Sequence, residues 1–301
     1  MSVSLPLHHQ TVPNTDSVSL NAAPRAAVLL SRAVRFAVNR QSLGAPGSNP
    51  PDRNGYGGVP AVVGFGQYLE LIVTCRGKAD PVTGYFIDIK TIDQGTRAHV
   101  VPAISAACRG EVQTTPEAVL AATAPALSAS LGGTLASLRL NLSPFSSIEH
   151  SMAMTSPDAA PARAILRQRF EIAAAHRLHA AGLSDEENRA TFGKCNHPAG
   201  HGHNYVFEPA VALADTSGRF TLAMLEAMVY EHLTLPFDHT HLNLDRQEFD
   251  QSRGGLNPSV ENIAQVFFSI LQPVVACCPS GAKLLQMTVW ETEKTSAQYP
   301  G

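Results

Sequence analysis

The stretch FEIAAAHRLHAAGLSDEENRATFGKCNHPAGHGHNYVFE, residues 170–208, decides how the chain is interpreted, because it gathers His176, His201 and His203. Alternate residues of a strand point to the same face, so His201 and His203 share a face. His176 ends a run of small residues that permits close approach. Three imidazoles with an open fourth position are typical of a catalytic zinc site. We predict a metal site here; the alternative is a set of surface or core histidines without a metal.

Two further groups around this stretch could move protons. Cys195 follows Lys194 and would lie near a zinc ion, and positive charge lowers a thiol pKa and favours the thiolate as a base or nucleophile. Asp238 precedes His239, and a carboxylate beside an imidazole can orient it and stabilise its charged form. His241 competes with His239 for this role. The alternatives are an inert cysteine and an ordinary loop.

A carboxylate and three cations complete the candidate residues. Glu291 directly follows an apolar strand, where it could accept two N–H donors from the edge of a guanidine-like ring; the alternative is a solvated strand end. Arg177, Lys194 and Arg189 are possible phosphate partners. Ordinary surface charge explains them equally well, and for Arg189 it is the preferred interpretation.

The chain repeats itself weakly, in the same order, over its two halves. The echoes pair residues 80–93 with 215–225, 64–67 with 200–203, 101–103 with 235–237, and 133–142 with 281–290. We predict two copies of one unit. The predicted divisions are a tail at 1–27, a first unit at 28–145, a Ser- and Pro-containing linker at 146–164 and a second unit at 165–301.

Each unit is predicted to be α+β. Period-2 alternation indicates strands at 68–76 and 284–290, and helical spacing of apolar residues indicates helices at 221–233 and 259–272. Ser259 is the expected N-cap of the second helix. Strands at the ends of a unit and helices in its middle favour an antiparallel sheet with helices on one face.

Composition excludes several classes of protein. The chain has 301 residues, of which 44% are hydrophobic and 16% charged, so it is not disordered as a whole. A net charge of −3 without a long basic run does not indicate nucleic-acid binding. No run approaches ~18 apolar residues, and the start does not resemble a signal peptide. Five cysteines without framework spacing favour a reducing, cytoplasmic location.

The stretch 170–208, together with FDHTHLN (237–243), PSVENIA (258–264) and WETEKTSAQYPG (290–301), resembles the 6-pyruvoyltetrahydropterin synthase family. The resemblance implies a T-fold (tunnelling fold), an antiparallel sheet with two helices on one side, whose units form barrels that stack in pairs. It implies that His176, His201 and His203 bind zinc. It implies that Cys195 is the base and that Asp238 and His239 form a relay that serves a neighbouring unit. It also implies that Glu291 anchors the pterin, with Ser259 and Glu261 near it.

The implied reaction converts 7,8-dihydroneopterin triphosphate to 6-pyruvoyltetrahydropterin with release of triphosphate and without an external redox cofactor. Five residues separate Cys195 from His201, which favours this reaction over that of the 6-carboxytetrahydropterin synthases of the queuosine pathway, where the gap is typically shorter. That second reaction on the same substrate remains an alternative. A non-catalytic pterin-binding assembly is a third.

The first unit lacks the family residues. Phe65 and Gln67 stand where the paired histidines would be, Ile104 and Ser105 replace the relay pair, and Ser143 replaces the glutamate. We predict a degenerate T-fold unit without a metal site, with the loop 44–60 near the lost site. Because the relay must come from a neighbour, we expect a homotrimer in which second units share one ring and first units share the other.

Overall fold

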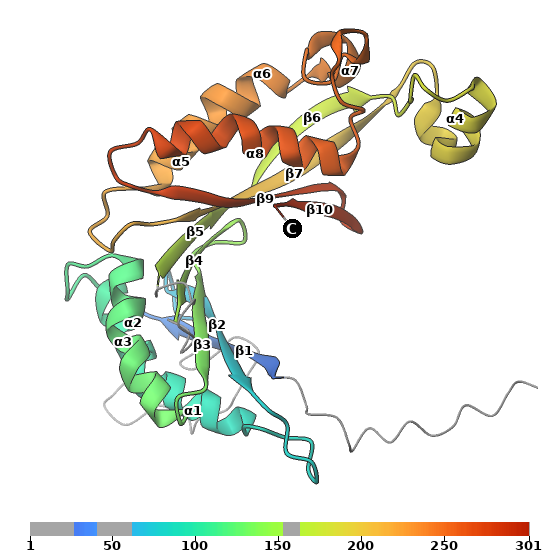
Figure 1. The fold of residues 1–301 in the computed structure, drawn as a ribbon. Helices are drawn as coiled ribbons and strands as arrows, with labels where there is room; N and C mark the ends of the chain where they lie inside the picture. The colour runs from blue at the N-terminus through green and yellow to red at the C-terminus, as the bar shows by residue number, and fades with distance from the viewer. Residues whose placement is uncertain (1–26, 41–61, 153–162, 301) are drawn as a thin grey trace, which may run out of the picture.

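The computed structural model describes residues 27–40, 62–152 and 163–300. The predicted tail, the loop 44–60 and part of the predicted linker lie outside this range. The described residues form one ten-stranded sheet with helices along it (Figure 1).

The first half runs strand, strand, helices, strand, strand. Its elements are β1 (Val28–Val38), β2 (Gln67–Gly77), α1 (Ile89–His99), α2 (Val101–Cys108), α3 (Pro116–Ser130), β3 (Leu135–Asn141) and β4 (Ser146–Ser151). The strands pair antiparallel in sequence order. The predicted strand 68–76 is confirmed as β2, whose inward residues Leu69, Leu71 and Val73 are buried.

The second half contains more elements than the first. Its strands are β5 (Arg163–Gln168), β6 (Phe170–His176), β7 (His201–Ala212), β8 (Thr240–His241), β9 (Lys283–Thr292) and β10 (Thr295–Tyr299). Its helices are α4 (Asp185–Phe192), η1 (Gly193–Asn196), α5 (Leu222–Val229), the π-helical η2 (Tyr230–Thr234), α6 (Leu235–Phe237), α7 (Leu242–Asp245), η3 (Gln251–Arg253) and α8 (Val260–Ala276). Both β5 and β6 pair along one edge of β7, and β9 pairs along the other edge.

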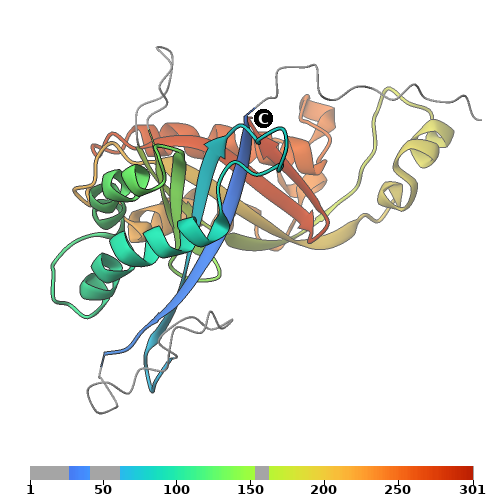
Figure 2. The same cartoon turned by 90° about the horizontal axis from the view of Figure 1, so that it is seen from below.

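The helices cover one face of each half of the sheet, as the alternating patterns predict (Figures 1 and 2). In the second half α8 buries Ile263, Phe267 and Leu271, and the ring of Phe267 meets that of Phe207 on β7 with centroids 5.1 Å apart. In the first half α3 buries Leu120 and Leu127 in the same way. The expected α+β architecture is therefore confirmed.

Two element boundaries differ from the sequence prediction. Residues 146–151 were expected in the linker but form β4, with Ser146, Ser147 and Ile148 all buried. Hydrogen bonding along both edges of β4 stabilises this polar strand, which its composition conceals. The helix predicted at 259–272 continues through Pro273 to Ala276, because the proline lies on the exposed face while Val275 anchors the last turn in the core.

The two halves are joined side by side. β4 pairs antiparallel with β5 over six residue pairs, from Ser146 opposite Gln168 to Ser151 opposite Arg163. Both halves therefore belong to one continuous sheet, and the expectation that they would lie in separate stacked rings is wrong for this chain. The homotrimer was inferred from that stacking and loses its basis. Among the described residues, no helix is long and apolar enough to cross a membrane.

Candidate metal centre and active site

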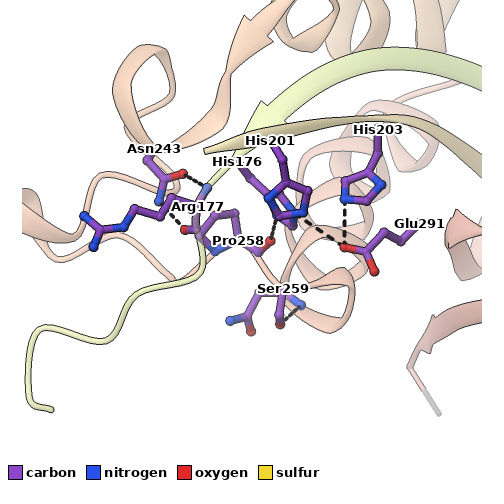
Figure 3. A network of polar contacts seen from close by, with 9 residues as sticks. His176, Arg177, His201, His203, Asn243, Pro258, Ser259 and Glu291 are labelled. Atoms are coloured by element: carbon purple, nitrogen blue, oxygen red, sulfur yellow. Dashed lines mark hydrogen bonds and ion pairs between the residues drawn. The ribbon is translucent and has the colours of Figure 1, made fainter. Parts of the chain in front are cut away.

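The ends of β6 and β7 bring three imidazoles together. His176 lies opposite His201, and Ala174 lies opposite His203, so the pleat directs all three imidazoles to the helix-covered face. Their ring centroids are 4.6 to 5.1 Å apart. The structure thus gathers the three predicted ligands (Figure 3).

His176 is fixed in the tautomer that a metal requires. Its Nδ1 lies 2.7 Å from the carbonyl oxygen of Pro258, which can only accept, so Nδ1 carries the proton and Nε2 is left with its lone pair. The Nε2 atoms of His176 and His201 are 3.1 Å apart. The side chain of His176 is fully buried, and this burial, with smaller contributions from neighbouring histidines, lowers its pKa to about 4.

Glu291 lies at the end of β9 and completes a four-residue cluster. Its Oε1 is 3.5 Å from Nε2 of both His176 and His203, and the ligand atoms of all four residues lie within 4.8 Å of one another. The buried Nε2 of His203 has no hydrogen-bond partner within the described part of the chain. Imidazoles and a carboxylate are ligands that zinc accepts, so these residues fit a metal ion. The sequence placed Glu291 near a pterin but did not anticipate its contact with the histidines.

Cys195 lies in η1, on a turn that is tied to the end of β6. The amide of Leu178 donates to the Cys195 carbonyl at 2.9 Å, and Arg177 Nε donates to the Asn196 carbonyl at 3.1 Å. Desolvation, followed by the negative charge of Glu291, raises the pKa of the Cys195 thiol. The sequence predicted a lowered pKa from Lys194, but Lys194 is exposed to solvent. A cation held beside Glu291 would oppose these effects.

Glycine is needed where the chain enters β7. Gly200 has φ +70°, and an added Cβ would lie 2.8 Å from the carbonyl oxygen of His176 and 2.7 Å from Nε2 of His241. At Gly202 the nearest atom would be the Ala174 carbonyl oxygen, 3.7 Å away. The close approach of β6 and β7 at the first histidine therefore depends on Gly200.

Asp238 and His239 form an ion pair at the outer edge of β6. Nδ1 of His239 lies 2.8 Å from Asp238 Oδ2, and Asp238 Oδ1 accepts the Ala173 amide at 2.8 Å. That amide, with a smaller contribution from His239, lowers the pKa of Asp238. The His239 side chain is 82% exposed. It borders a hollow that is also lined by Gly202, His203 and His241, so this hollow touches one residue of the four-residue cluster, although neither Asp238 nor His239 belongs to the cluster.

The remaining candidates have structural roles. Ser259 caps α8 by accepting the Asn262 amide, as predicted, and it follows the carbonyl that fixes His176. Glu261 is exposed in the first turn of α8. Sequence reasoning missed Asn243, which accepts the Arg177 amide at 2.8 Å and donates to the Arg177 carbonyl at 3.0 Å (Figure 3). Its place in the FDHTHLN segment was the available signal.

Comparison with known proteins places this site in a family. Residues 165–301 match the family model described as 6-pyruvoyl tetrahydropterin synthase. Human 6-pyruvoyl tetrahydrobiopterin synthase is 34% identical over 147 residues, which cover 46% of this chain and 92% of the human protein. The chain belongs to the 6-pyruvoyl tetrahydropterin synthase family.

Other members of the 6-pyruvoyl tetrahydropterin synthase family match the same half. The 6-pyruvoyl tetrahydrobiopterin synthase of Dictyostelium discoideum is 30% identical over 140 residues, which cover 46% of this chain and 96% of that protein. The solved 6-pyruvoyl tetrahydropterin synthase of Caenorhabditis elegans is 35% identical, covers 46% of this chain and 94% of its own, and superposes with a TM-score of 0.40.

Proposed function

We propose that the second unit is a zinc-dependent lyase that converts 7,8-dihydroneopterin triphosphate to 6-pyruvoyltetrahydropterin and triphosphate. The observation that carries the proposal is the convergence of His176, His201 and His203 beside Glu291, with Cys195 on the adjoining turn. The relatives named above are synthases of this type. The five-residue gap between Cys195 and His201 supports the pyruvoyl product.

The residues divide the chemistry among them. The three imidazoles would hold zinc, which supplies Lewis acidity that makes the C–H bonds in the side chain of the substrate easier to deprotonate. Cys195 receives that proton as the thiolate. Glu291, at the border of the cluster, receives the amide and amino hydrogens of the pterin in charge-assisted hydrogen bonds. Ser259 and Glu261, at the start of α8, would lie near the pterin.

Elimination of triphosphate followed by tautomerisation completes the reaction without a net change in the oxidation state of the molecule. The substituent on the pterin is oxidised as the ring is reduced, so no external oxidant or reductant is needed. Arg177, which directly follows His176 in the sequence, is proposed as a phosphate partner. The proposal requires Cys195 to be deprotonated, which burial alone opposes and a neighbouring cation favours.

The Asp238–His239 pair is proposed as a proton relay for Cys195 of another copy of the protein. The pair lies at the outer edge of β6, on the side where β4 of the same chain joins β5. Its neighbour along the sheet is therefore the first unit, where Phe65 and Gln67 stand at the places of His201 and His203. The relay can therefore reach the Cys195 of another copy only across a contact between two such sheets, which would make the active site shared within a homo-oligomer.

The first half is proposed to be a second, degenerate copy of the same unit, now extended to Ser151 to include β4. If β5, the insertion of α4 and η1, and the short β8 are set aside, the second half runs β6, β7, helices, β9, β10, in the order of β1, β2, helices, β3, β4 in the first half. Gly64 and Gly200 both adopt positive φ just before the second strand of their half. Side-by-side joining of the copies supports a barrel assembly in which the two kinds of unit alternate. The five free cysteines support a reducing, cytoplasmic location.

Triphosphate release tests this proposal. Zinc-loaded protein is mixed with dihydroneopterin triphosphate, and chelator-treated protein and Cys195→Ala serve as controls. We expect release only from the zinc-loaded wild type. Tight pterin binding without release, unchanged in Cys195→Ala, would replace the proposal with a binding function. Acetaldehyde among the products would indicate the 6-carboxytetrahydropterin reaction instead.

A further inference from the structure

The first half contains a cavity of its own. It lies between the β2–β3 pair and the helices α2 and α3, with a volume of about 240 Å³. Leu69, Ile104, Val119 and Leu140 form its apolar walls, and Gln67 and Leu142 lie at its more exposed end. Among the described residues, none that lines it carries a charge.

The strand register places this cavity where the second half has its histidine cluster. In the first half Val38 lies opposite Gln67, and in the second Ala174 lies opposite His203, two residues before the end of β6. When Gln67 is aligned with His203, Leu69 falls on Tyr205. The two halves can therefore be compared residue by residue along β2 and β7.

The strands β3 and β9 extend this alignment of the two halves. Glu70 pairs with Asn141 in the first half, and Val206 pairs with Trp290 in the second. With Glu70 on Val206, Leu142 falls on Glu291. The sequence comparison placed Ser143 there, one residue too far, because it could not see the register.

The N-terminal ends of α3 and α8 support the same alignment of the two halves. Thr115 caps α3 by accepting the Ala118 amide, as Ser259 caps α8 by accepting the Asn262 amide. Thr115 lines the cavity, and Ser259 follows the carbonyl that holds His176. The cavity thus keeps the position of part of the metal cluster, with Gln67 in place of His203 and Leu142 in place of Glu291. The same register puts the exposed Phe65 and Arg40 at the places of His201 and His176, and neither lines the cavity.

We propose that this cavity is a metal-independent binding site for an uncharged, planar, fused-ring molecule with a lactam edge. Apolar walls without a charged residue exclude phosphates and carboxylates, because a charge buried there would have no partner. An apolar cavity of about 150 Å³ is known to accept benzene, so the larger volume here suits two fused rings. The amide of Gln67 offers one donor and one acceptor, which a lactam edge can satisfy together.

Ligand-observed NMR titration of the full-length protein with three probes tests the proposal. The probes are isoquinolin-1(2H)-one, which has two rings and a lactam edge, naphthalene, which lacks the edge, and naphthalene-1-carboxylate, which is charged. We expect the lactam to bind most tightly, naphthalene less tightly and the carboxylate not at all. A carboxylate that binds as well as the lactam would overturn the proposal, as would a lactam that does not bind.

Three variants locate the binding and separate it from the second unit. Ala107→Phe fills the cavity and should weaken lactam binding at least about 10-fold, whereas Ala122→Phe, the same change on an exposed position of α3, should leave it unchanged. Gln67→Leu should weaken binding of the lactam about 5-fold and leave binding of naphthalene unaffected, because only the hydrogen bonds are lost.

Circular dichroism checks that each variant folds. Lactam binding that survives Ala107→Phe would place the probe elsewhere and refute the assignment. Triphosphate release by the second unit is a separate readout, so failure of one proposal leaves the other standing.

Discussion

As the pH falls, the zinc affinity of this site should decrease less steeply than that of a site made of three histidines with ordinary pKa values. Burial lowers the pKa of His176 to about 4, and its Nδ1 proton is held by Pro258. The folded-state pKa lies below the usual value, so this imidazole stays neutral in the fold as the pH falls from about 6.5 towards 4. The metal therefore displaces no proton from it over this range. The same shift makes the metal-free fold lose stability across that window, because the unfolded chain binds the proton first.

The size of this change in zinc affinity follows from competition between protons and zinc for the imidazole nitrogens. A histidine with a pKa of about 6.5 loses about 30-fold of its metal affinity at pH 5, and three would lose about 3 × 10⁴-fold together. Because His176 stays neutral over this range, the loss of zinc affinity between about pH 7.5 and pH 5 should not exceed about 10³-fold. The lowered pKa of His203, caused mainly by burial, reduces it further.

Competition with a chromophoric chelator across this pH range measures the effect on the wild-type protein. The expected slope corresponds to two protons or fewer displaced per zinc ion. A decrease of about 10⁴-fold or more at pH 5 would refute the reasoning, because it would require His176 to titrate as an exposed imidazole.

Three further outcomes concern the cysteine, the glycine and the relay pair. Cys195→Ala should lower turnover at least about 10²-fold without loss of bound zinc, as removal of a general base does; parallel loss of zinc would make the cysteine a ligand instead. Gly200→Ala should lower zinc occupancy and cost about 1–3 kcal/mol of stability through its positive φ and the Cβ contact at 2.8 Å. Gly202→Ala is the matched control and should retain zinc; equal damage from both would show that Gly200 is not special. The His239→Ala and Cys195→Ala variants, each inactive alone, should regain activity when co-expressed, and absence of recovery would confine the relay to a single protomer.

The sequence was most informative where the chemistry depends on local spacing. The alternation of His201 and His203 on a strand, with His176 behind small residues, predicted a metal site; the structure brings these three side chains together, and the metal stays a prediction. Period-2 alternation located β2, and Ser259 after Pro258 located the start of α8. Each of these signals lies within a few residues, so backbone geometry alone carries it.

What the sequence could not predict depends on pairing between distant segments. The strand β4 is polar, and its serines are buried only because β3 and β5 flank it. Glu291 reaches His176 and His203 through the register of β9 on β7. The same kind of pairing, β4 with β5, places the two halves side by side, and no local pattern reports it.

The identity of the product tests the central claim most directly. Zinc-loaded protein and Cys195→Ala are each incubated with 7,8-dihydroneopterin triphosphate, and the pterins are identified by mass spectrometry. The account predicts 6-pyruvoyltetrahydropterin from the wild type and unreacted substrate from the variant. A carboxylated pterin with acetaldehyde, or a pyruvoyl product that survives Cys195→Ala, would contradict it.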